Sequence, residues 1–489
     1  MEEAKQMKID EQIDSFFEPI ANKMSEIVFY SVNIGGTDVK LILLWLMACG
    51  IFFTVYLGFI NIRYFCYSIR LVSGRADGPE SQSDDDGQIS RFQALMTSLS
   101  GTVGLGNISG VALAISAGGP GAMLWMIVLG FFGMSSKFAE VMLGVKYRHH
   151  PDPEHPDTIS GGPMYYLKAA FENRNIPFIG TALAMLFALC CMLGAIGGGN
   201  MYQANQAYQQ VKIATGGDAS IIADTGWVFG LGLAVLVGLV IIGGIKSIAN
   251  VASKLVPAMG ILYLGAGLIV IGINFQQIPT AIITVFTEAF SPQAAYGGFI
   301  GVLFVGAQRA FFSNEAGLGS ASIVHATAKT NSPVSQGFVG MLGPFIDTVI
   351  ICSITAMVIV ITDSYKVTGE IEGIALTSRA FESTLPGFQY ILTLTVFLFA
   401  FSTMITWSYY GSKGMSFLCG EKEWPNTAFK LLFCLCIIIG CSSKLDNIIA
   451  FTDAAILSLA IPNIIGLYML APEIRRDVKE YTQALKKSE

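Results

Sequence analysis

Charged side chains are scarce in this chain: Asp, Glu, Lys and Arg together make up 13% of its 489 residues. A typical soluble domain carries about 25% charged residues, so this composition excludes an ordinary soluble enzyme. Disorder is excluded as well, because 53% of the residues are hydrophobic and disordered chains have low hydrophobicity. The 29 basic residues are scattered along the chain without a long basic run, which leaves no basic patch for nucleic acid.

Side chains that bind metal ions or carry out catalysis are also few. The chain has four histidines, and His149, His150 and His155 fall together in one polar segment. Its nine cysteines include no C-x-x-C pair, and cysteine inside an apolar run behaves as a small apolar residue. No Ser/His/Asp or paired-carboxylate arrangement is visible. We therefore expect no catalytic residue, no cofactor and no enzyme activity.

Long apolar runs take up most of the chain. A membrane-spanning helix needs about 20 apolar residues, and hydropathy predicts eleven spans. They lie near residues 41–60, 93–117, 121–145, 178–209, 225–244, 255–273, 297–324, 337–362, 389–411, 428–442 and 446–470. The polar breaks between them are too short for a soluble domain. The sequence thus predicts an all-α integral membrane protein with one transmembrane domain over 41–471 and a C-terminal tail over 472–489.

The first 40 residues differ from the rest. Residues 1–14 are acidic and polar, so they do not resemble a signal peptide. Apolar side chains then recur at helical spacing from Ile13 to Val28, without a run long enough to span a membrane. This pattern predicts an amphipathic helix that lies at the membrane surface, within an N-terminal segment over 1–40.

Glycine is abundant, with 53 residues, and it gathers in two apolar segments. One reads SGTVGLGNISG over 100–110 and the other reads SNEAGLGS over 313–320, so both fit S-x-x-x-G-L-G-[N/S]. Each glycine destabilises a helix by about 1 kcal/mol, so both clusters predict unwinding in mid-membrane. Unwound backbone is tolerated there only where it is buried or lines a cavity. Glycines that merely let helices pack closely are the alternative.

The two motifs lie five spans apart, so their helices run in opposite directions through the membrane. Paired glycine-interrupted segments in halves of opposite topology are typical of inverted-repeat transporters. We expect two repeats of five helices, over about 93–273 and 297–470, each with one broken helix, and one extra helix before them. In such folds the broken helices bind substrate and coupling ion near the middle of the membrane.

Several stretches resemble the alanine or glycine:cation symporter family. They are GTVGLGNISGVALAISAGGPGAMLWM (101–126), GMSSKFAEVMLGVKYR (133–148), GNMYQAN (199–205), RAFFSNEAGLGSASIVHA (309–326), GPFIDTVIICSITA (343–356) and FAFSTMITWSYYG (399–411). The resemblance covers about residues 40–470. It implies sodium-driven uptake of a small neutral amino acid on a bundle of two inverted five-helix repeats, which neurotransmitter:sodium symporters share. Thr406 stands where the family's pattern has glycine.

The substrate site is expected where the first motif unwinds. Free backbone amides of Leu105, Gly106 and Asn107 would bind the carboxylate of an amino acid, and carbonyl groups near Thr102 and Phe312 would bind its ammonium group. Bulky neighbours would then refuse any side chain larger than hydrogen or methyl. The full set of expected substrate-binding residues is Thr102, Gly104, Leu105, Gly106, Asn107, Asn200, Gln203, Phe312, Ser313, Thr403 and Trp407.

A sodium site is expected beside it, made of oxygen atoms from two helices. The carbonyl groups of Ser100, Val103 and Phe399 and the hydroxyl groups of Ser402 and Thr403 would supply five ligands. A site without a carboxylate favours sodium over a proton, because a proton needs a titratable group. Hydroxyl groups in spans also bond back to their own helix, and this alternative stays open for Ser402 and Thr403.

Charged residues inside spans are functional candidates. Arg309 and Asp347 fall in mid-span as candidates for a buried pair or gate, and Glu315 is a candidate for fixing the unwound backbone of the second motif. A proton-coupled carrier or an exchanger that uses Glu315 or Asp347 is the alternative function. A channel would need polar stripes on several helices, and only two discontinuous segments stand out here.

The basic residues predict the orientation in the plasma (inner) membrane. With the N-terminus outside, 19 Lys and Arg fall on the cytoplasmic side and 8 outside, while Lys137 and Arg309, inside spans, complete the 29. Cytoplasmic loops carry an excess of basic residues. We therefore expect the N-terminus outside and the C-terminus in the cytoplasm.

Cysteine labelling tests this orientation. In a background without reactive native cysteines, an impermeant thiol reagent applied to intact cells should modify Ser383→Cys and leave Ser83→Cys unmodified. The reason is that residues 363–388 are expected outside and residues 61–92 inside, and breaking the cells should make position 83 reactive. Ready labelling of position 83 in intact cells would contradict the predicted orientation.

Overall fold

Helices make up most of the part of the chain that the structure, a computed structural model, describes. The described residues are 9–34, 37–76, 86–151, 158–172, 174–291, 298–366, 373–420 and 422–488. Position 83, chosen above for labelling, lies outside the described residues, whereas Ser383 is exposed. Within the described part, two short strands form one antiparallel hairpin in which Val32 pairs with Val39. The rest of the regular structure there is helical.

The helices and strands fall into an N-terminal part and two predicted repeats, and the boundaries of these repeats stay predictions. The N-terminal part contains α1 (Ile9–Val28), β1 (Ser31–Ile34), β2 (Thr37–Lys40), α2 (Leu41–Tyr56), α3 (Ile60–Arg63) and α4 (Phe65–Val72). The first expected repeat contains α5 (Arg91–Thr102), α6 (Ser109–Gly118), α7 (Ala122–Lys146), α8 (Pro163–Glu172), α9 (Pro177–Ile196), η1 (Gly197–Met201), α10 (Tyr202–Ala214), η2 (Gly217–Ala219), α11 (Gly226–Ile241) and α12 (Gly244–Ile273). Between the repeats lie η3 (Phe275–Gln277) and α13 (Ile278–Ala289).

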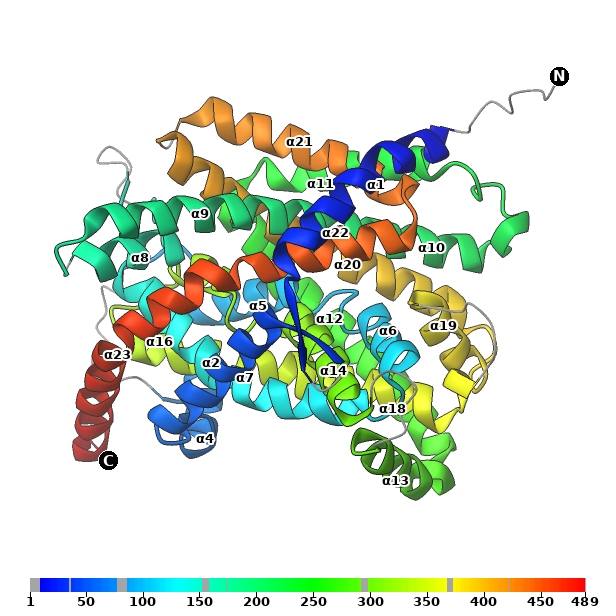
Figure 1. Cartoon of the computed structure of the whole chain (residues 1–489), viewed down its shortest axis with the longest axis horizontal. Coiled ribbons are helices and arrows are strands. Elements are labelled where there is room, and N and C mark those ends of the chain that lie inside the picture. The colour runs from blue at the N-terminus through cyan, green and yellow to red at the C-terminus, as the bar shows by residue number, and fades with distance from the viewer. Residues whose placement is uncertain are drawn as a thin grey trace.

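The second expected repeat and the C-terminal tail complete the chain. They contain α14 (Gly298–Asn314), α15 (Ser320–His325), α16 (Pro333–Gly340), α17 (Leu342–Pro344), η4 (Phe345–Cys352), α18 (Ser353–Ile361), η5 (Ser364–Lys366), α19 (Ile374–Glu382), α20 (Phe388–Cys419), α21 (Glu423–Ser442), α22 (Leu445–Ser458) and α23 (Ala460–Ser488). Most of the long helices run roughly parallel to the longest axis of the molecule (Figure 1). The start of α1 and the end of α23 lie towards opposite ends of that axis (Figure 1).

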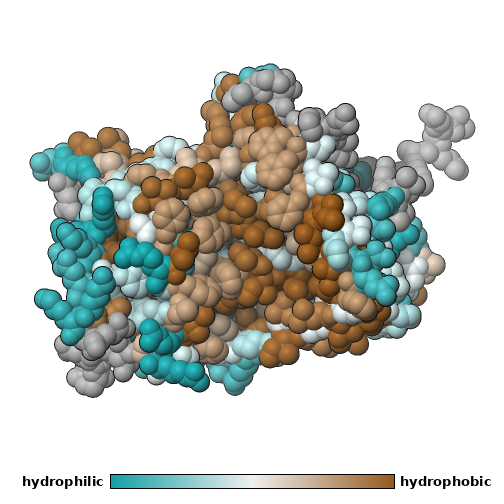
Figure 2. Space-filling view, turned by 90° about the horizontal axis from the view of Figure 1, so that it is seen from below, coloured by the Kyte–Doolittle hydropathy of each residue, from teal (hydrophilic) through white to brown (hydrophobic). Residues whose placement is uncertain are grey.

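Seven helical stretches in the described part of the chain are long and apolar enough to cross a membrane. They are Ala122–Lys146, Pro177–Ala214, Gly244–Ile273, Pro333–Ile361, Phe388–Cys419, Trp424–Ser442 and Leu445–Lys487, and α2, α6 and α11 are shorter apolar helices. Figure 2 shows apolar side chains across the middle of the molecule and hydrophilic ones towards both ends, as expected for a protein in a bilayer. The predicted all-α membrane fold is confirmed, while the number of eleven spans stays a prediction.

Both glycine motifs interrupt their helices, as predicted from the sequence. The break between α5 and α6 covers residues 103–108, and the break between α14 and α15 covers residues 315–319. The second break contains positive φ angles at Glu315 (54°), Gly317 (90°) and Gly319 (82°). Glycine adopts such a backbone freely, but at Glu315 it is unfavourable and needs support from surrounding contacts.

Two π-helical turns, η1 and η4, were not predicted from the sequence. Each makes its helix wider by one residue per turn, and such turns occur often at functional sites. In η1, Gly199 allows a close approach to α20, because a Cβ added there would lie 2.2 Å from Cγ of Trp407, while Gly197 and Gly198 face α22. The η4 turn carries Asp347 and faces both helix breaks.

The first helix break packs against the end of α14, just before the second break. A Cβ added to Gly106 would lie 3.4 Å from Cδ1 of Phe312 at the end of α14. A Cβ added to Gly104 would lie 2.5 Å from Oγ1 of Thr403 and 3.0 Å from Oε1 of Gln203. The first break therefore lies between α10, α14 and α20, and only glycine fits at position 104 without a shift of its neighbours.

Gly104→Ala should destabilise the protein, because the added methyl group would overlap Thr403. Overpacking of this kind costs about 1–3 kcal/mol, so we expect a lower apparent Tm of the purified protein, measured by tryptophan fluorescence. Gly260→Ala is the matched control, because a Cβ at that position in α12 meets nothing within 4 Å. An unchanged Tm for Gly104→Ala would contradict the close packing of the first break.

Candidate functional site

Two side-chain amides bind the backbone of the first break. The Gly104 N–H donates to Oδ1 of Asn107 (2.8 Å), and the Leu105 N–H donates to Oε1 of Gln203 (3.0 Å). The Asn107 N–H donates to the Gly104 carbonyl group (3.2 Å), whereas the Gly106 N–H has no acceptor among the described residues. Of the three amides predicted to bind a carboxylate, only that of Gly106 is therefore free here.

A buried carboxylate joins the two breaks. Asp347, in η4, has no exposed surface. It accepts hydrogen bonds from Nδ2 of Asn107 in the first break, and from Oγ of Ser313 (2.8 Å) at the end of α14. Thr348 adds a third donor (2.8 Å). Within the described part of the chain no ion pair reaches Asp347, and the three side chains that donate hydrogen bonds to its carboxylate are neutral.

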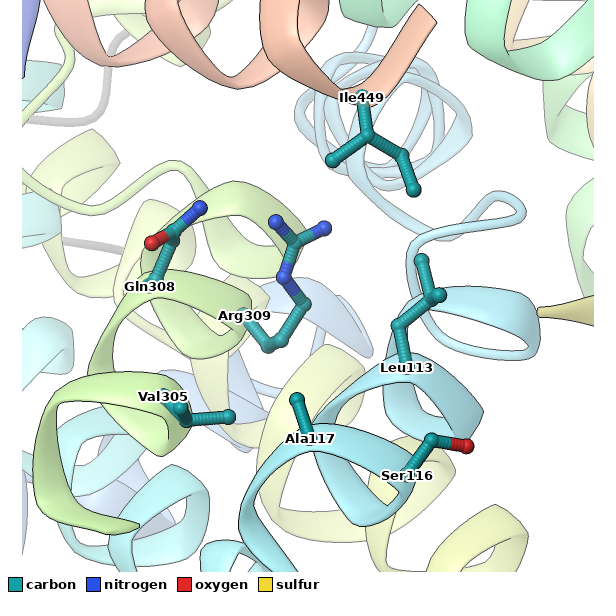
Figure 3. A pocket seen from close by; sticks show the side chains of 7 residues that line it. All are labelled: Leu113, Ser116, Ala117, Val305, Gln308, Arg309 and Ile449. Atoms are coloured by element: carbon teal, nitrogen blue, oxygen red, sulfur yellow. The ribbon is translucent and has the colours of Figure 1, made fainter. Parts of the chain in front are cut away.

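Arg309 does not pair with Asp347, so this candidate pair is wrong. The guanidinium group instead donates to Asp453 of α22, which also accepts a hydrogen bond from Gln308. The reason is position along α14. Ser313 contacts Asp347, while Arg309 lies about one helical turn earlier on this helix, about 6 Å away. Arg309 lines a cavity together with residues of α6 and α22 (Figure 3).

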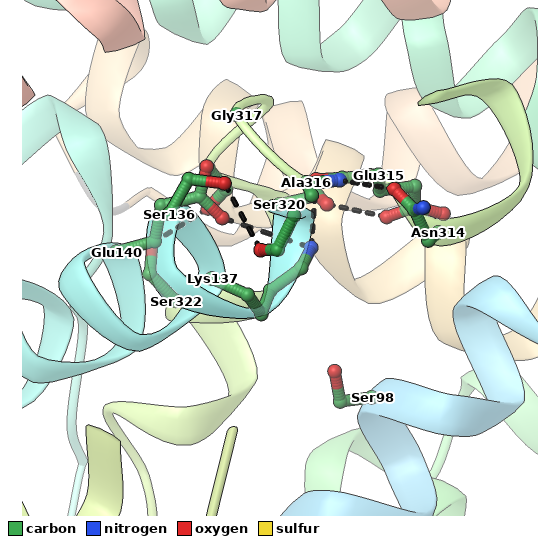
Figure 4. Close-up of polar contacts among 12 residues, drawn as sticks. Ser98, Ser136, Lys137, Glu140, Asn314, Glu315, Ala316, Gly317, Ser320 and Ser322 are labelled. Atoms are coloured by element: carbon green, nitrogen blue, oxygen red, sulfur yellow. Dashed lines mark hydrogen bonds and ion pairs between the residues drawn. The ribbon is translucent and has the colours of Figure 1, made fainter. Parts of the chain in front are cut away.

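The second break rests on a lysine from α7 (Figure 4). Nζ of Lys137 donates to the Glu315 carbonyl group (2.7 Å) and lies 3.6 Å from the carboxylate of Glu140. Nδ2 of Asn463 donates to the Gly317 carbonyl group (2.9 Å) and to Oε1 of Glu140 (3.1 Å). These contacts satisfy carbonyl groups that the missing helical turn leaves open.

The Glu315 side chain crosses the second break. Its carboxylate accepts hydrogen bonds from Ser320, the first residue of α15, and from Nε1 of Trp407 in α20 (3.2 Å). Trp407 also donates to the Gly101 carbonyl group near the end of α5 (3.2 Å). Glu315 thus connects the two halves of its broken helix, which is the role its place in the motif suggests.

The predicted sodium ligands lie together where α5 meets α20, but some of them bind each other. Oγ of Ser402 donates to the Phe399 carbonyl group (3.0 Å), so this hydroxyl group bonds back to its own helix. Oγ of Ser100 donates to the Ser402 carbonyl group (2.7 Å) and accepts from Thr406 (3.1 Å). Val103 begins the break beside them.

Thr403 differs from its neighbours. Its side chain is 1% exposed, and its hydroxyl group has no hydrogen-bond partner among the described residues. The hydroxyl group faces Gly104, as the 2.5 Å approach of an added Cβ shows. A buried polar group without a partner is costly, so this oxygen atom is available for a ligand.

Aromatic side chains enclose the same region. The rings of Phe312 and Tyr202 meet edge to face with centroids 5.2 Å apart, and Trp407 is 1% exposed. The Thr102 hydroxyl group bonds back to its own helix at Ser98 (3.4 Å).

Asn200 is not brought to this region. Its Nδ2 atom donates to the Phe433 carbonyl group of α21 (2.6 Å). Gln203, one helical turn further along, does reach the first break. Of the predicted substrate-binding residues, Asn200 is therefore the one that the structure places against another helix.

Sequence reasoning missed the contacts of Asn463 and Tyr202, and it did not predict Asp453 as the partner of Arg309. Tyr202 shares a hydrogen bond with Ser109 at the start of α6. The signal for Asn463 was available, because a carboxamide in an apolar run needs a partner inside the membrane.

Comparisons with known proteins agree with this geometry. A model of the sodium:alanine symporter family matches residues 22–489. The sodium/alanine symporter AgcS of Methanococcus maripaludis is 38% identical over 91% of this chain and 94% of that protein. The amino-acid carrier protein AlsT of Bacillus subtilis is 32% identical over 97% and 94%, and the probable sodium/glutamine symporter GlnT of the same organism is 32% identical over 91% and 89%.

The solved structure of MhsT in complex with L-phenylalanine has the same fold. The similarity covers 81% of this chain and 99% of MhsT, with a TM-score of 0.50 and 13% sequence identity. Transporters are not enzymes, and the apolar helices make this chain a multi-pass membrane protein. The chain belongs to the sodium:alanine symporter family.

Proposed function

We propose that this protein imports a small neutral amino acid, alanine or glycine, together with sodium across the plasma membrane by alternating access. The observation that carries the proposal is that the first break lies against the end of α14 and has two unused groups beside it, the Gly106 amide and the Thr403 hydroxyl group. One group suits a carboxylate and the other a cation. The relative AgcS is named a sodium/alanine symporter, which favours the same pair of ligands here.

The amino-acid carboxylate would bind at the backbone of the first break. The free Gly106 N–H supplies one donor, and the Leu105 N–H becomes a second donor when Gln203 releases it. Backbone amides at a helix break favour an anion. The ammonium group would bind carbonyl groups near Thr102 and Phe312, which end the helices on the two sides of the site.

The size of the substrate would be set by aromatic side chains. Phe312 lies within 3.4 Å of a Cβ built on Gly106, and Trp407 fits against the glycines of η1. Both side chains are buried, and hydrogen bonds hold the indole ring of Trp407 in place. A side chain larger than methyl would overlap these rings, and such overlap excludes larger substrates without any specific contact.

Buried charge supports a cation as the coupling ion. From α5 onward, the buried carboxylates of the described residues outnumber the buried Lys and Arg side chains by four to two: Glu140, Glu315, Asp347 and Asp453 against Lys137 and Arg309. Uncompensated buried charge is strongly unfavourable. A bound cation near Thr403 and the first break would reduce this imbalance, and it would raise affinity for the substrate by linkage.

Alternating access would use the two breaks as hinges. Broken helices in inverted-repeat transporters let one bundle rock against the other around the site. The Arg309–Asp453 pair joins α14 to α22 beside an open cavity (Figure 3) and would separate when that side opens. We place this cavity on the outer side, because the predicted orientation puts the N-terminus outside.

Proton coupling is the second candidate function. The Asp347 carboxylate accepts hydrogen bonds from neutral side chains, and Glu315 lies beside Trp407 at the site. A proton on either carboxylate would reduce the same charge imbalance as sodium. Flux in proteoliposomes separates the two ions.

Uptake of labelled alanine should require an inward sodium gradient and should not follow a pH gradient. Thr403→Ala should raise the sodium concentration for half-maximal uptake about tenfold, which corresponds to about 1.4 kcal/mol for a lost ligand. Thr395→Ala is the matched control on the same helix, because the buried Thr395 hydroxyl group already bonds to the Ile391 carbonyl group (2.8 Å). Full uptake without sodium that tracks the pH gradient would contradict sodium coupling and make Glu315 and Asp347 the residues to mutate.

Trp407→Ala should widen the range of accepted substrates towards leucine, methionine and glutamine. The removed indole ring leaves space beside the first break, and competition with labelled alanine uptake measures the change. Trp125→Ala is the control, because Trp125 in α7 lies elsewhere and bonds to the Ala289 carbonyl group. Normal alanine uptake with continued rejection of the larger amino acids would show that the pocket is assigned wrongly.

A further inference from the structure

One ion pair joins the two helices that border the open cavity. Arg309 of α14 and Asp453 of α22 form this pair, and they are 6% and 1% exposed. The cavity beside them has a volume of about 270 Å³ and is lined by Leu113, Ser116, Ala117, Val305, Gln308, Arg309 and Ile449 (Figure 3). Ala117 is exposed, so the cavity reaches the surface. Separation of α14 from α22 would widen it.

The N-terminal part of the chain holds α22. Residues 9–40, without the undescribed positions 35–36, are called the strap here. Its helix α1 lies across α22 (Figure 1), and Phe17 packs edge-on against Phe451 with ring centroids 5.2 Å apart. Oδ1 of Asp14 accepts hydrogen bonds from the Lys444 N–H (2.8 Å) and from Asn447 (2.9 Å). A carboxylate at this N-terminus also suits the dipole of α22.

The far end of the strap holds α14. Nζ of Lys40, the last residue of β2, donates to Oε1 of Gln308 (2.8 Å) and lies 4.2 Å from the ring centroid of Phe29. The amide nitrogen of Gln308 donates in turn to Asp453, the partner of Arg309. A continuous chain of polar contacts therefore runs from the strap to the ion pair.

We propose that the strap keeps α14 and α22 together across the Arg309–Asp453 pair, and that Lys40 is the positioning residue that fastens it. Lys40 acts through Gln308, which it orients towards Asp453. A hydrogen bond from a charged donor is about twice as strong as a neutral one, so the ammonium group suits this place. This inference rests on the proposed function in one respect only, namely that opening of the cavity is a step of transport.

The rate of thiol labelling in the cavity tests the strap directly. Ser116→Cys is the reporter, because Ser116 is a half-buried cavity residue. Ile221→Cys is the reference, because Ile221 is 95% exposed in a loop away from the cavity. The background lacks the accessible native cysteines Cys66, Cys419 and Cys434. A small charged methanethiosulfonate reagent is applied to the purified full-length protein, and the ratio of the two rates is compared between variants.

Lys40→Met, which removes the charge and the donor but keeps the length, should raise this ratio about tenfold. Lys40→Arg, which keeps both charge and donors, should leave it near the wild-type value. Both variants must elute as the wild type in size-exclusion chromatography. If Lys40→Met does not fold, Gln308→Leu serves as the second variant, because it breaks the same chain at the next residue. An unchanged ratio in Lys40→Met or in Gln308→Leu would overturn the proposal.

A double-mutant cycle distinguishes the proposed positioning role of Lys40 from a merely structural role of this residue. Because Lys40 acts through Gln308, Lys40→Met combined with Gln308→Leu should raise the labelling ratio no further than either change alone. If the labelling ratio of the double variant rises by the product of the two single effects, the proposed order of contacts is overturned. Transport of labelled alanine by Lys40→Met should show a changed KM, since the equilibrium between closed and open cavity shifts, while the maximal rate changes less.

The pH dependence gives a further readout. Burial, and then the charge of nearby Arg309, lower the pKa of Lys40 to about 8. The charged and polar groups that face it are Gln308 and Arg309 of α14 and Asp453 of α22. The ammonium group is present below pH 8 and lost above it, so the normalised ratio in the wild type should rise between pH 7 and 9. Lys40→Arg should remain flat, and a wild-type ratio that stays flat would contradict the role of the charge.

Failure of this proposal can be told apart from failure of the proposed function. Labelling of Ser116→Cys requires neither sodium nor alanine, so it reports on the strap even if the protein carries another substrate. An unaltered labelling ratio with normal sodium-dependent uptake overturns the strap alone. An increased ratio without alanine uptake supports the strap and overturns the proposed substrate.

Discussion

Backbone groups that leave a helix inside a membrane must find partners within the protein, and this requirement organises the centre of the molecule. The first break is supported by two carboxamides, Asn107 and Gln203, which bind its N–H groups. The second break is supported by Lys137 and Asn463, which bind its carbonyl groups. Side-chain acceptors therefore support the first break, whereas side-chain donors support the second.

Much of the fold, including both helix breaks, follows from the sequence. Glycine clusters in apolar runs predict both breaks, and their separation by five predicted spans, an odd number, predicts that the two broken helices run in opposite directions. The choice of partners does not follow, because a helical period identifies a face but not its height or its neighbour. Arg309 therefore meets Asp453 and not Asp347, and Asn200 turns towards α21. The π-helical turns further change which side chains share a helix face, and no residue pattern in the sequence predicts these turns.

MhsT and this chain share a fold at 13% sequence identity, so most side chains of the bundle can differ while the helices keep their arrangement. In this chain, small residues lie where elements pack closely, such as Gly104 beside Thr403 and Gly199 beside Trp407. The chemistry of the site is then set by a few polar side chains on a common scaffold.

Lys137 has a consequence for the symmetry of the transporter. Its ammonium group is covalently part of the protein and lies at the second break, on the Glu315 carbonyl group. With sodium at the first break, as proposed, the two repeats would each hold a positive charge where their helix is interrupted, one permanent and one exchangeable. The two halves are then alike in shape but different electrically. Only the sodium position could be empty, so one half of the pseudo-symmetric bundle would respond to the ion gradient and the other half would not.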